Sequence, residues 1–413
     1  MKRIMMVLLA GLALAGAAHA DDDNAPPYHD KLLGDLGGER TKLADAGVDV
    51  SLNYEGDVWQ VLSGGKKRIA TYLDYVQLST TIDNEKLFGL KGNTMTIALI
   101  DDNGTRTNGS TVGSIQGIDN SEVVSNGVRL YEAWMQQEFF DGRVSLLAGV
   151  HDLNTEFAST TISDNYLMPT MQIGQSFADS GRNGPSIFPQ TSLAARLKVK
   201  PTESSYVMAA IFDGVPGDPP HNGSAIRLDD KDGSLLVAEM GLAPKVADTD
   251  DAVNKLAVGV WEYTGAEANL EYPSIQSTPQ GMYLLSSYRF YHDKDAGKDV
   301  TAFARGGFAD GQTEQTDWDY EAGVVAHGFV PKRPDGEIGI GISEAHNSRQ
   351  YMSAQETAGT PAEHAETSFE LYYRDAVAQG ITVQPDVQYI VNPGTDPTLD
   401  NALVIGARFG VSF

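Results

Sequence analysis

Hydrophobic and polar residues alternate along most of this chain with a period of two. Near position 50, Val48, Val50, Leu52 and Tyr54 alternate with polar residues, and Leu403 to Phe413 alternates in the same way. A period of two places apolar side chains on one face of a strand and polar side chains on the other. Sixteen such segments occur, at residues 48–60, 71–83, 93–101, 128–140, 143–152, 191–201, 205–213, 234–243, 254–264, 281–291, 299–310, 318–330, 335–345, 364–375, 379–391 and 402–413. The pattern predicts an all-β protein.

The lengths of the segments and of their connections favour a membrane barrel over a soluble multi-sheet protein. Most segments have 9 to 13 residues, which is the length that a tilted strand needs to cross a bilayer, and an even number is usual in single-chain bacterial barrels. If the chain enters from the periplasm, the odd-numbered connections are external, and two of these, 102–127 and 153–190, are the longest. Phe413 ends the last apolar face. We therefore predict a single 16-stranded antiparallel transmembrane β-barrel.

The beginning of the chain has the pattern of an exported protein. Lys2 and Arg3 precede an apolar stretch, and Ala18-His19-Ala20 matches the small-residue pattern of a cleavage site. A short helix is predicted from Leu32 to Ala46. The chain is thus divided into a signal peptide (1–20), an N-terminal periplasmic segment with a short helix (21–46) and the transmembrane β-barrel (47–413). Export and a barrel together predict the bacterial outer membrane.

Composition narrows the possible functions. Lys and Arg number 30 against 56 Asp and Glu, for a net charge of −26, so no nucleic-acid partner is expected. The chain has no Cys and its 8 His form no HExxH pattern, so neither a metal nor a cofactor is expected. No Gly-x-Ser-x-Gly motif indicates a nucleophile, although so acidic a chain offers many carboxylate pairs for glycoside hydrolysis. A channel is favoured, with a barrel hydrolase as the weaker alternative.

Six segments, in order along the chain, carry a family resemblance. They are LLGDLGGERTKLADAGVDVSLNYEGDVW (32–59), RLYEAWMQQEF (129–139), GVHDLNTEFA (149–158), KLAVGVWEYT (255–264), GFVPKRPDGEIGIGIS (328–343) and ETSFELYYRDAVAQGITVQPDVQYIVNPG (366–394). They are similar to blocks of the carbohydrate-selective porins of the OprB type, over about Leu33 to Phe413. The resemblance implies a sixteen-stranded outer-membrane barrel, often a homotrimer, that passes monosaccharides such as glucose. One departure is Val150-His151, where we expect a basic residue directly after the glycine of the fifth strand.

The connection from Leu153 to Gln190 is the candidate for a constriction loop folded into the barrel. A connection of this length without regular structure is uncommon unless it has a function, and the family resemblance favours a constriction. Its side chains suit packing against an inner wall; they include Asn154, Glu156, Phe157, Asn165, Tyr166, Met168, Phe177 and Arg182. The alternative is an external loop that shields the barrel mouth or packs at a subunit interface.

The alternation also predicts which side chains point into a water-filled lumen. In segment 128–140, Glu132 and Trp134 share a face, and charges belong on the lumen face. An aromatic ring beside a carboxylate suits the C–H face and vicinal hydroxyls of a pyranose, although Trp134 packing against the folded-in loop is an equal alternative. Most lumen charges touch no solute. The candidate pore-lining residues are Glu132, Trp134, His151, Glu156, Arg196, Lys198, Arg305, Glu370, Arg374 and Arg408.

Aromatic residues on the apolar faces are predicted to point outward. Tyr54, Tyr131, Tyr373 and Phe413 are expected at the headgroup boundary, which aromatic rings favour. The expected partners on the outside are therefore outer-membrane lipid and lipopolysaccharide. In the lumen, the family resemblance implies a monosaccharide. The predicted function is passive, selective diffusion of monosaccharides such as glucose into the periplasm. A general-diffusion porin for small hydrophilic solutes is the main alternative; an anion-specific porin would need many lysines along the pore, and the acidic net charge disfavours it.

Overall fold

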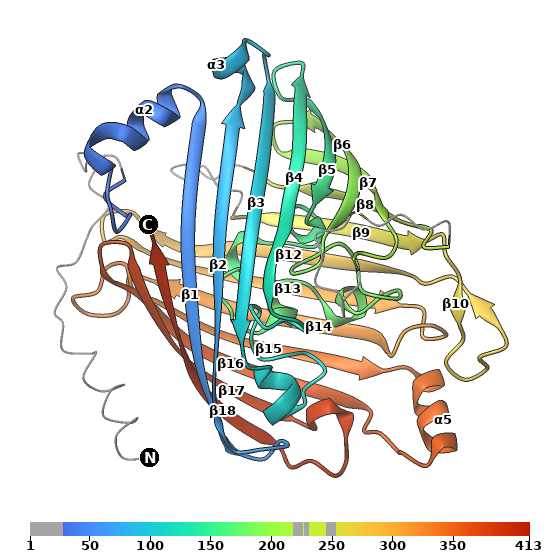
Figure 1. Cartoon of the computed structure of the whole chain (residues 1–413). Helices are drawn as coiled ribbons and strands as arrows, with labels where there is room; N and C mark the ends of the chain where they lie inside the picture. Colours follow the sequence, from blue (N-terminus) through green and yellow to red (C-terminus); the bar gives the residue numbers. More distant parts are fainter. Residues whose placement is uncertain (1–27, 218–225, 227–230, 245–252) are drawn as a thin grey trace.

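The computed structural model describes residues 28–217, 226, 231–244 and 253–413. Within them, sixteen antiparallel strands close into one barrel (Figure 1), which confirms the predicted fold class. The strands are β1 (Val48–Ser63), β2 (Ala70–Asp83), β3 (Asn93–Gly104), β4 (Gly127–Phe139), β5 (Val144–His151), β6 (Ser192–Thr202), β7 (Ser205–Asp213), β8 (Ser234–Leu242), β9 (Lys255–Tyr263), β12 (Gln280–Asp293), β13 (Lys298–Ala309), β14 (Thr316–His327), β15 (Glu337–Asn347), β16 (Ala365–Ala378), β17 (Ile381–Val391) and β18 (Ala402–Ser412). β1 pairs with β18 and closes the barrel. The predicted signal peptide, residues 1–20, lies outside the described residues.

Strand β7 shows how the alternation becomes two faces of the wall. Tyr206 and Phe212 are buried on the inner side, whereas Val207 and Ile211 are exposed on the outer side. An outer surface of this kind matches the apolar band that a barrel presents to lipid. No helix in the described part of the chain is long and apolar enough to cross a bilayer.

The predicted N-terminal helix is shorter than Leu32–Ala46. A 3-10 turn (Leu36–Gly38) precedes α2 (Glu39–Asp45). Gly34, Gly37 and Gly38 have φ angles of 55°, 71° and 94°, and these left-handed conformations interrupt a helix. α2 therefore begins only after the last of these glycines.

The connections at the two ends of the barrel differ in length, as predicted. The α2 end, which also holds the C-terminus (Figure 1), carries α3 (Asn84–Phe88) and short turns such as 203–204 and 379–380. The opposite end carries α5 (Arg349–Ala358), the small sheet of β10 (Glu267–Ala268) with β11 (Gln276–Ser277), and a 3-10 turn (Pro393–Thr395). In the predicted orientation the chain enters the barrel from the periplasm. Since β1 follows directly after α2, the α2 end is then the periplasmic end.

Tyr131 points into the barrel, contrary to the prediction that it faces lipid. Ala98 pairs with Glu132 whereas Leu99 pairs with Leu130, so Tyr131 forms a β-bulge. An extra residue reverses the alternation on either side of it. Tyr131 is consequently 8% exposed and its hydroxyl donates to Asp152. Tyr54 of β1 was also predicted to face outward, and it contacts the Tyr72 hydroxyl on the outer face.

Two long connections of the far end fold back into the lumen (Figure 1). The β3–β4 loop (residues 105–126) contains a π-helical turn (Asn108–Val112). The β5–β6 loop (residues 152–191) contains 3-10 turns (Leu153–Thr155, Thr161–Ser163 and Pro169–Met171) and α4 (Gln175–Ala178). These two loops determine what remains of the channel.

Candidate functional site

The β5–β6 loop packs on the inner wall like a second layer. Leu153, Phe157, Tyr166 and Phe177 are at most 3% exposed. The Phe177 ring lies parallel to the wall residue Trp261, with 5.1 Å between ring centres. Burial of this much apolar surface stabilises the inward position. The loop is therefore a constriction, as predicted, rather than a cover over the barrel mouth.

Carboxylates of the wall hold this loop through its backbone. Glu239 on β8 accepts the Ala158 N–H at 2.9 Å. Glu370 on β16 accepts two N–H groups, from Leu167 at 2.6 Å and Met168 at 2.9 Å. Asp319 on β14 accepts the Ser176 N–H. Because the loop starts at β5 and reaches β16, it crosses the lumen.

Arg305 of β13 is the cationic counterpart of these anchors. Its guanidinium donates to Glu321 at 2.9 Å and to the carbonyls of Ala158 and Gln172, both at 2.9 Å. It also donates to the Thr170 carbonyl. All three guanidinium nitrogens are thus bound by protein. Arg305 holds the loop at Ala158 and again at Thr170 and Gln172.

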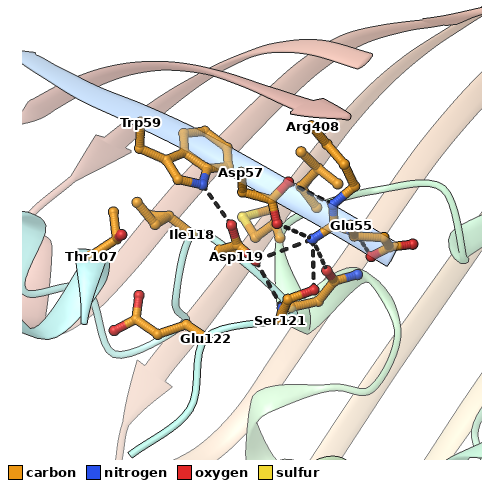
Figure 2. Close-up of polar contacts among 12 residues, drawn as sticks. Glu55, Asp57, Trp59, Thr107, Ile118, Asp119, Ser121, Glu122 and Arg408 are labelled. Atoms are coloured by element: carbon orange, nitrogen blue, oxygen red, sulfur yellow. Dashed lines mark hydrogen bonds and ion pairs between the residues drawn. The ribbon is translucent and has the colours of Figure 1, made fainter. Parts of the chain in front are cut away.

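Arg408 holds the β3–β4 loop at the seam where the barrel closes (Figure 2). On the barrel itself it donates twice to Asp57, at 2.8 and 2.9 Å, and pairs with Glu55 at 3.2 Å. From the loop it binds Asp119 at 3.1 Å and the side chains of Asn120 and Ser121 at 2.7 and 2.9 Å. Arg408 thereby connects β18, β1 and the loop.

Asp119 is the loop residue at the centre of this network. Its second carboxylate oxygen accepts the Trp59 indole N–H at 2.5 Å. Burial raises the pKa of Asp119, while the charge of Arg408 and the Trp59 hydrogen bond act against that rise. Nearby, Ile118 is fully buried. The loop is therefore held by both polar and apolar contacts.

A second attachment of the β3–β4 loop lies on β16. Glu366 accepts the N–H groups of Ile115 and Gln116 at 3.0 and 3.1 Å. The Gln116 side chain donates to the Glu366 carbonyl at 2.9 Å and accepts from Ser343. The β3–β4 loop and the β5–β6 loop therefore both fold inward and narrow the lumen.

Six of the predicted site residues meet on the wall of β4 to β6, and we call this group the β4–β6 cluster: Glu132, Trp134, His151, Glu156, Arg196 and Lys198. His151 lies between the two carboxylates, 3.1 Å from Glu132 and 3.3 Å from Glu156. Arg196 donates to Glu156 at 2.7 Å. The Trp134 ring stands edge-on to His151, with 5.9 Å between centres.

Glu156 is the only member of the cluster that comes from the β5–β6 loop. Burial alone would raise the pKa of Glu156, but the hydrogen bond from His151 and the charges of Arg196 and Lys198 outweigh it and lower the pKa to about 2. Glu156 is thus ionised at neutral pH. It ties the start of the loop to β6 and leaves alternating charges, with an aromatic ring beside them, along one side of the lumen.

Comparison with known proteins decides the family. The sequence profile described as "Carbohydrate-selective porin, OprB family" matches residues 67–413. The chain belongs to this family. Porin B of Pseudomonas aeruginosa is 27% identical over 98% of this chain and 96% of that protein. The putative porin QuiX of Acinetobacter baylyi is 22% identical over 92% of this chain and 93% of that protein.

Solved structures agree with the fold of the porin. The high-pH structure of Pseudomonas putida OprB matches 93% of this chain and 98% of that chain, with a TM-score of 0.83 and 22% identity. The low-pH structure of the same protein has a TM-score of 0.60 and 20% identity. The protein is an outer-membrane carbohydrate porin. Family and fold make it a channel rather than an enzyme.

The remaining predicted site residues of the porin lie apart from the β4–β6 cluster. Glu370, Arg305 and Arg408 are on the inner wall, as predicted, but their polar atoms are bound by the two loops. Arg374 lies at the periplasmic rim, in a hollow of about 420 Å³ that it shares with Lys31 of the N-terminal segment. The predicted site residues therefore lie in three places: the β4–β6 cluster, the inner wall beneath the two loops, and the periplasmic rim.

Sequence reasoning missed the inward position of the β3–β4 loop. Asp57, Asp119 and Glu366 carry it, and none of these was among the candidates. One signal was present, since Ile115 and Ile118 are apolar residues in a connection expected to be exposed. Buried apolar residues in a long connection indicate packing against the rest of the protein.

Proposed function

We propose that neutral monosaccharides such as glucose diffuse passively through the lumen between the β5–β6 loop and the β4–β6 cluster. The observation that carries this proposal is the path of the loop. It begins at β5, is bound to β8, β13, β14 and β16, and so occupies the part of the lumen opposite the cluster. In this proposal the solute passes beside the cluster.

The chemistry of the cluster suits a sugar in transit. Glu156 and Lys198 keep side-chain exposures of 16% and 26%, so both signs of charge are offered to a solute that donates and accepts hydrogen bonds. Trp134 supplies an aromatic surface next to them. Because the charges pair with each other, neither holds the solute tightly, which conduction requires. No energy input or cofactor is needed.

The outer surface supports lipid and lipopolysaccharide as neighbours of the porin. Large apolar side chains such as Leu284 and Phe308 are more than half exposed on it, and a barrel of this kind places them against lipid. We also propose the homotrimer that the family resemblance implies. Cross-linking in outer membranes, followed by electrophoresis without heating, distinguishes a trimer from a monomer.

Liposome swelling with the purified porin tests the proposed function. Glucose, a disaccharide and an amino acid of similar size to glucose are compared at equal osmotic strength. We expect the fastest swelling with glucose. Equal rates for the three solutes would contradict selectivity and indicate general diffusion of small hydrophilic solutes. An absence of swelling would contradict the open route.

A further inference from the structure

A hollow of about 340 Å³ lies between the β5–β6 loop and the wall of β6 to β9, and it shares Glu156 and Lys198 with the β4–β6 cluster. We call it the lysine cavity, because Lys198, Lys200 and Lys255 all line it. Hydroxyl groups of the loop, including Thr155 and Thr161, form another part of its lining. Lys200 is two residues from the end of β6, near the short turn at the periplasmic end of the barrel. In the proposed orientation, the cavity lies between the constriction and the periplasmic end of the barrel.

Two lysines of this cavity lie against one aromatic ring. The Nζ atoms of Lys198 and Lys255 lie 5.5 and 5.6 Å from the centre of the Tyr206 ring. Each also pairs with a carboxylate, Lys198 with Glu156 at 3.5 Å and Lys255 with Glu239 at 3.2 Å. Contacts with the ring and the carboxylates hold these two cations in place.

The carboxylates near the cavity are already occupied by other donors. Glu239 accepts hydrogen bonds from the Tyr206 and Tyr283 hydroxyls, at 2.5 and 2.6 Å, and from the Ala158 N–H. Glu156 is bound by Arg196 as well as by Lys198. Their charge is thus shared among several donors and only partly offsets the lysines.

Lys200 is the cation with no such compensation. Among the described residues, no carboxylate lies within 4.0 Å of its ammonium group, and the residue is exposed. Two carboxylates, Glu156 and Glu203, line the cavity against three lysines. Glu239, behind the lining, pairs with Lys255, and Glu156 pairs with Lys198, so Lys200 is the lysine of the lining that is left without an ion-pair partner among the described residues.

We propose that the lysine cavity is a second carbohydrate subsite that takes sugar acids such as aldonates and hexuronates. A sugar acid carries one carboxylate for Lys200 and Lys255 together with hydroxyls for the Thr155 and Thr161 side. One ammonium group without an ion-pair partner matches a monoanion better than a sugar phosphate. Ammonium groups in contact with water bind weakly and are screened by salt, so the solute is released. This inference rests on the proposed passage of carbohydrates.

Single-channel recording tests the subsite. Potassium gluconate, glucose and potassium acetate are added separately on the periplasmic side, and the concentration that halves the current is measured. Gluconate is expected to act at about one tenth of the glucose concentration, because one charged contact is added to the hydroxyl contacts. Acetate is expected to have no effect at these concentrations, since it lacks the hydroxyls.

Substitution of Lys200 identifies the residue responsible. Lys200→Gln is expected to raise the half-blocking concentration of gluconate at least about threefold more than that of glucose, as one exposed charged contact is lost. Lys200→Arg keeps the charge and should restore the block. Lys91→Gln is the matched control, because Lys91 is exposed in a connection at the same end of the barrel. Lys255 is a poorer target, since it also donates to the Ser159 carbonyl of the loop.

The outcomes separate this subsite from the proposed function. If glucose passes normally but Lys200→Gln leaves the gluconate block unchanged, the subsite is overturned and the proposed function stands. Equal block by gluconate and acetate also overturns it, because a carboxylate alone would then suffice. If the unmodified porin passes no glucose, the proposed function and the subsite both fail.

Discussion

The two sides of the inner wall carry the same kinds of residues but use them differently. On β13 and β14, the side chains of Arg305 and Glu321 are 2% and 0% exposed beneath the β5–β6 loop. On the β4–β6 side, Lys198 and Glu156 are 26% and 16% exposed. The alternation places all the strand residues among them on the inner face. They differ in whether a loop covers the side chain. A charge that points into the barrel therefore does not always reach the solute.

The covered side behaves like a protein interior. A buried charge is costly unless it is paired and hydrogen-bonded. Arg305 meets that condition with Glu321 and three loop carbonyls, and Glu370 with two loop N–H groups. The loop backbone, which also needs partners once it is away from water, is satisfied by the same contacts. The covered charges therefore stabilise the constriction.

The largest expected effect is that of Arg305→Ala. It leaves Glu321 buried without its partner and frees three loop carbonyls, so we expect a loss of about 3–5 kcal/mol of stability. Disaccharide passage should rise as the loop loosens. The unfolding temperature, followed by the shift in electrophoretic mobility, and disaccharide swelling measure the two effects. A variant with parental values for both would show that Arg305 is not an anchor.

Glu156→Gln tests the loop attachment on the other side through pH. The pKa of Glu156 is lowered to about 2 from its ordinary value of 4.5. Its contribution to stability is therefore fully present above pH 4.5 and is lost as the pH falls towards 2. Parent and variant should differ by at most about 3 kcal/mol at neutral pH, and the difference should vanish near pH 2. A difference that disappears already at pH 5 would contradict this account.

Asp119→Ala compares the β3–β4 loop with the β5–β6 loop. The substitution leaves the Trp59 N–H unpaired and removes one partner of Arg408, which keeps Asp57 and Glu55. We expect a loss of about 2 kcal/mol and wider solute passage. Glu122→Ala is the control, because its carboxylate accepts N–H groups of Asn108 and Gly109 within the same loop. An equal effect of both variants would argue against a specific tie to the seam.

The smallest effect on stability is expected from Trp134→Ala on the open side. Glucose swelling relative to that of an amino acid should fall about threefold, since one aromatic contact is lost. The unfolding temperature should change less than in Arg305→Ala. Trp134→Phe should retain selectivity, because the indole N–H has no hydrogen-bond partner among the described residues. If Trp134→Ala discriminates like the parent, the ring only packs against the wall.

The strands were predictable because period two and apolar content are local properties of the sequence. Predicted segment 205–213 and strand β7 coincide, and the predicted inward residues Arg196 and Arg305 do face inward. Tyr131 was predicted wrongly, since a bulge depends on pairing with β3 rather than on the order of residues in β4. The late start of the N-terminal helix was also missed, although the three glycines before it were visible.

The sequence by itself determined the barrel, its outer face and, through the family resemblance, the class of solute. Each of these depends on residues close together in the chain or on blocks that match as wholes. Only the tertiary structure decided which inward charges remain open, because that depends on contacts between distant residues, such as Glu370 with Leu167 or Arg408 with Asp119. Alternation assigns a side chain to a face, but a loop from elsewhere in the chain decides whether water or protein covers that face.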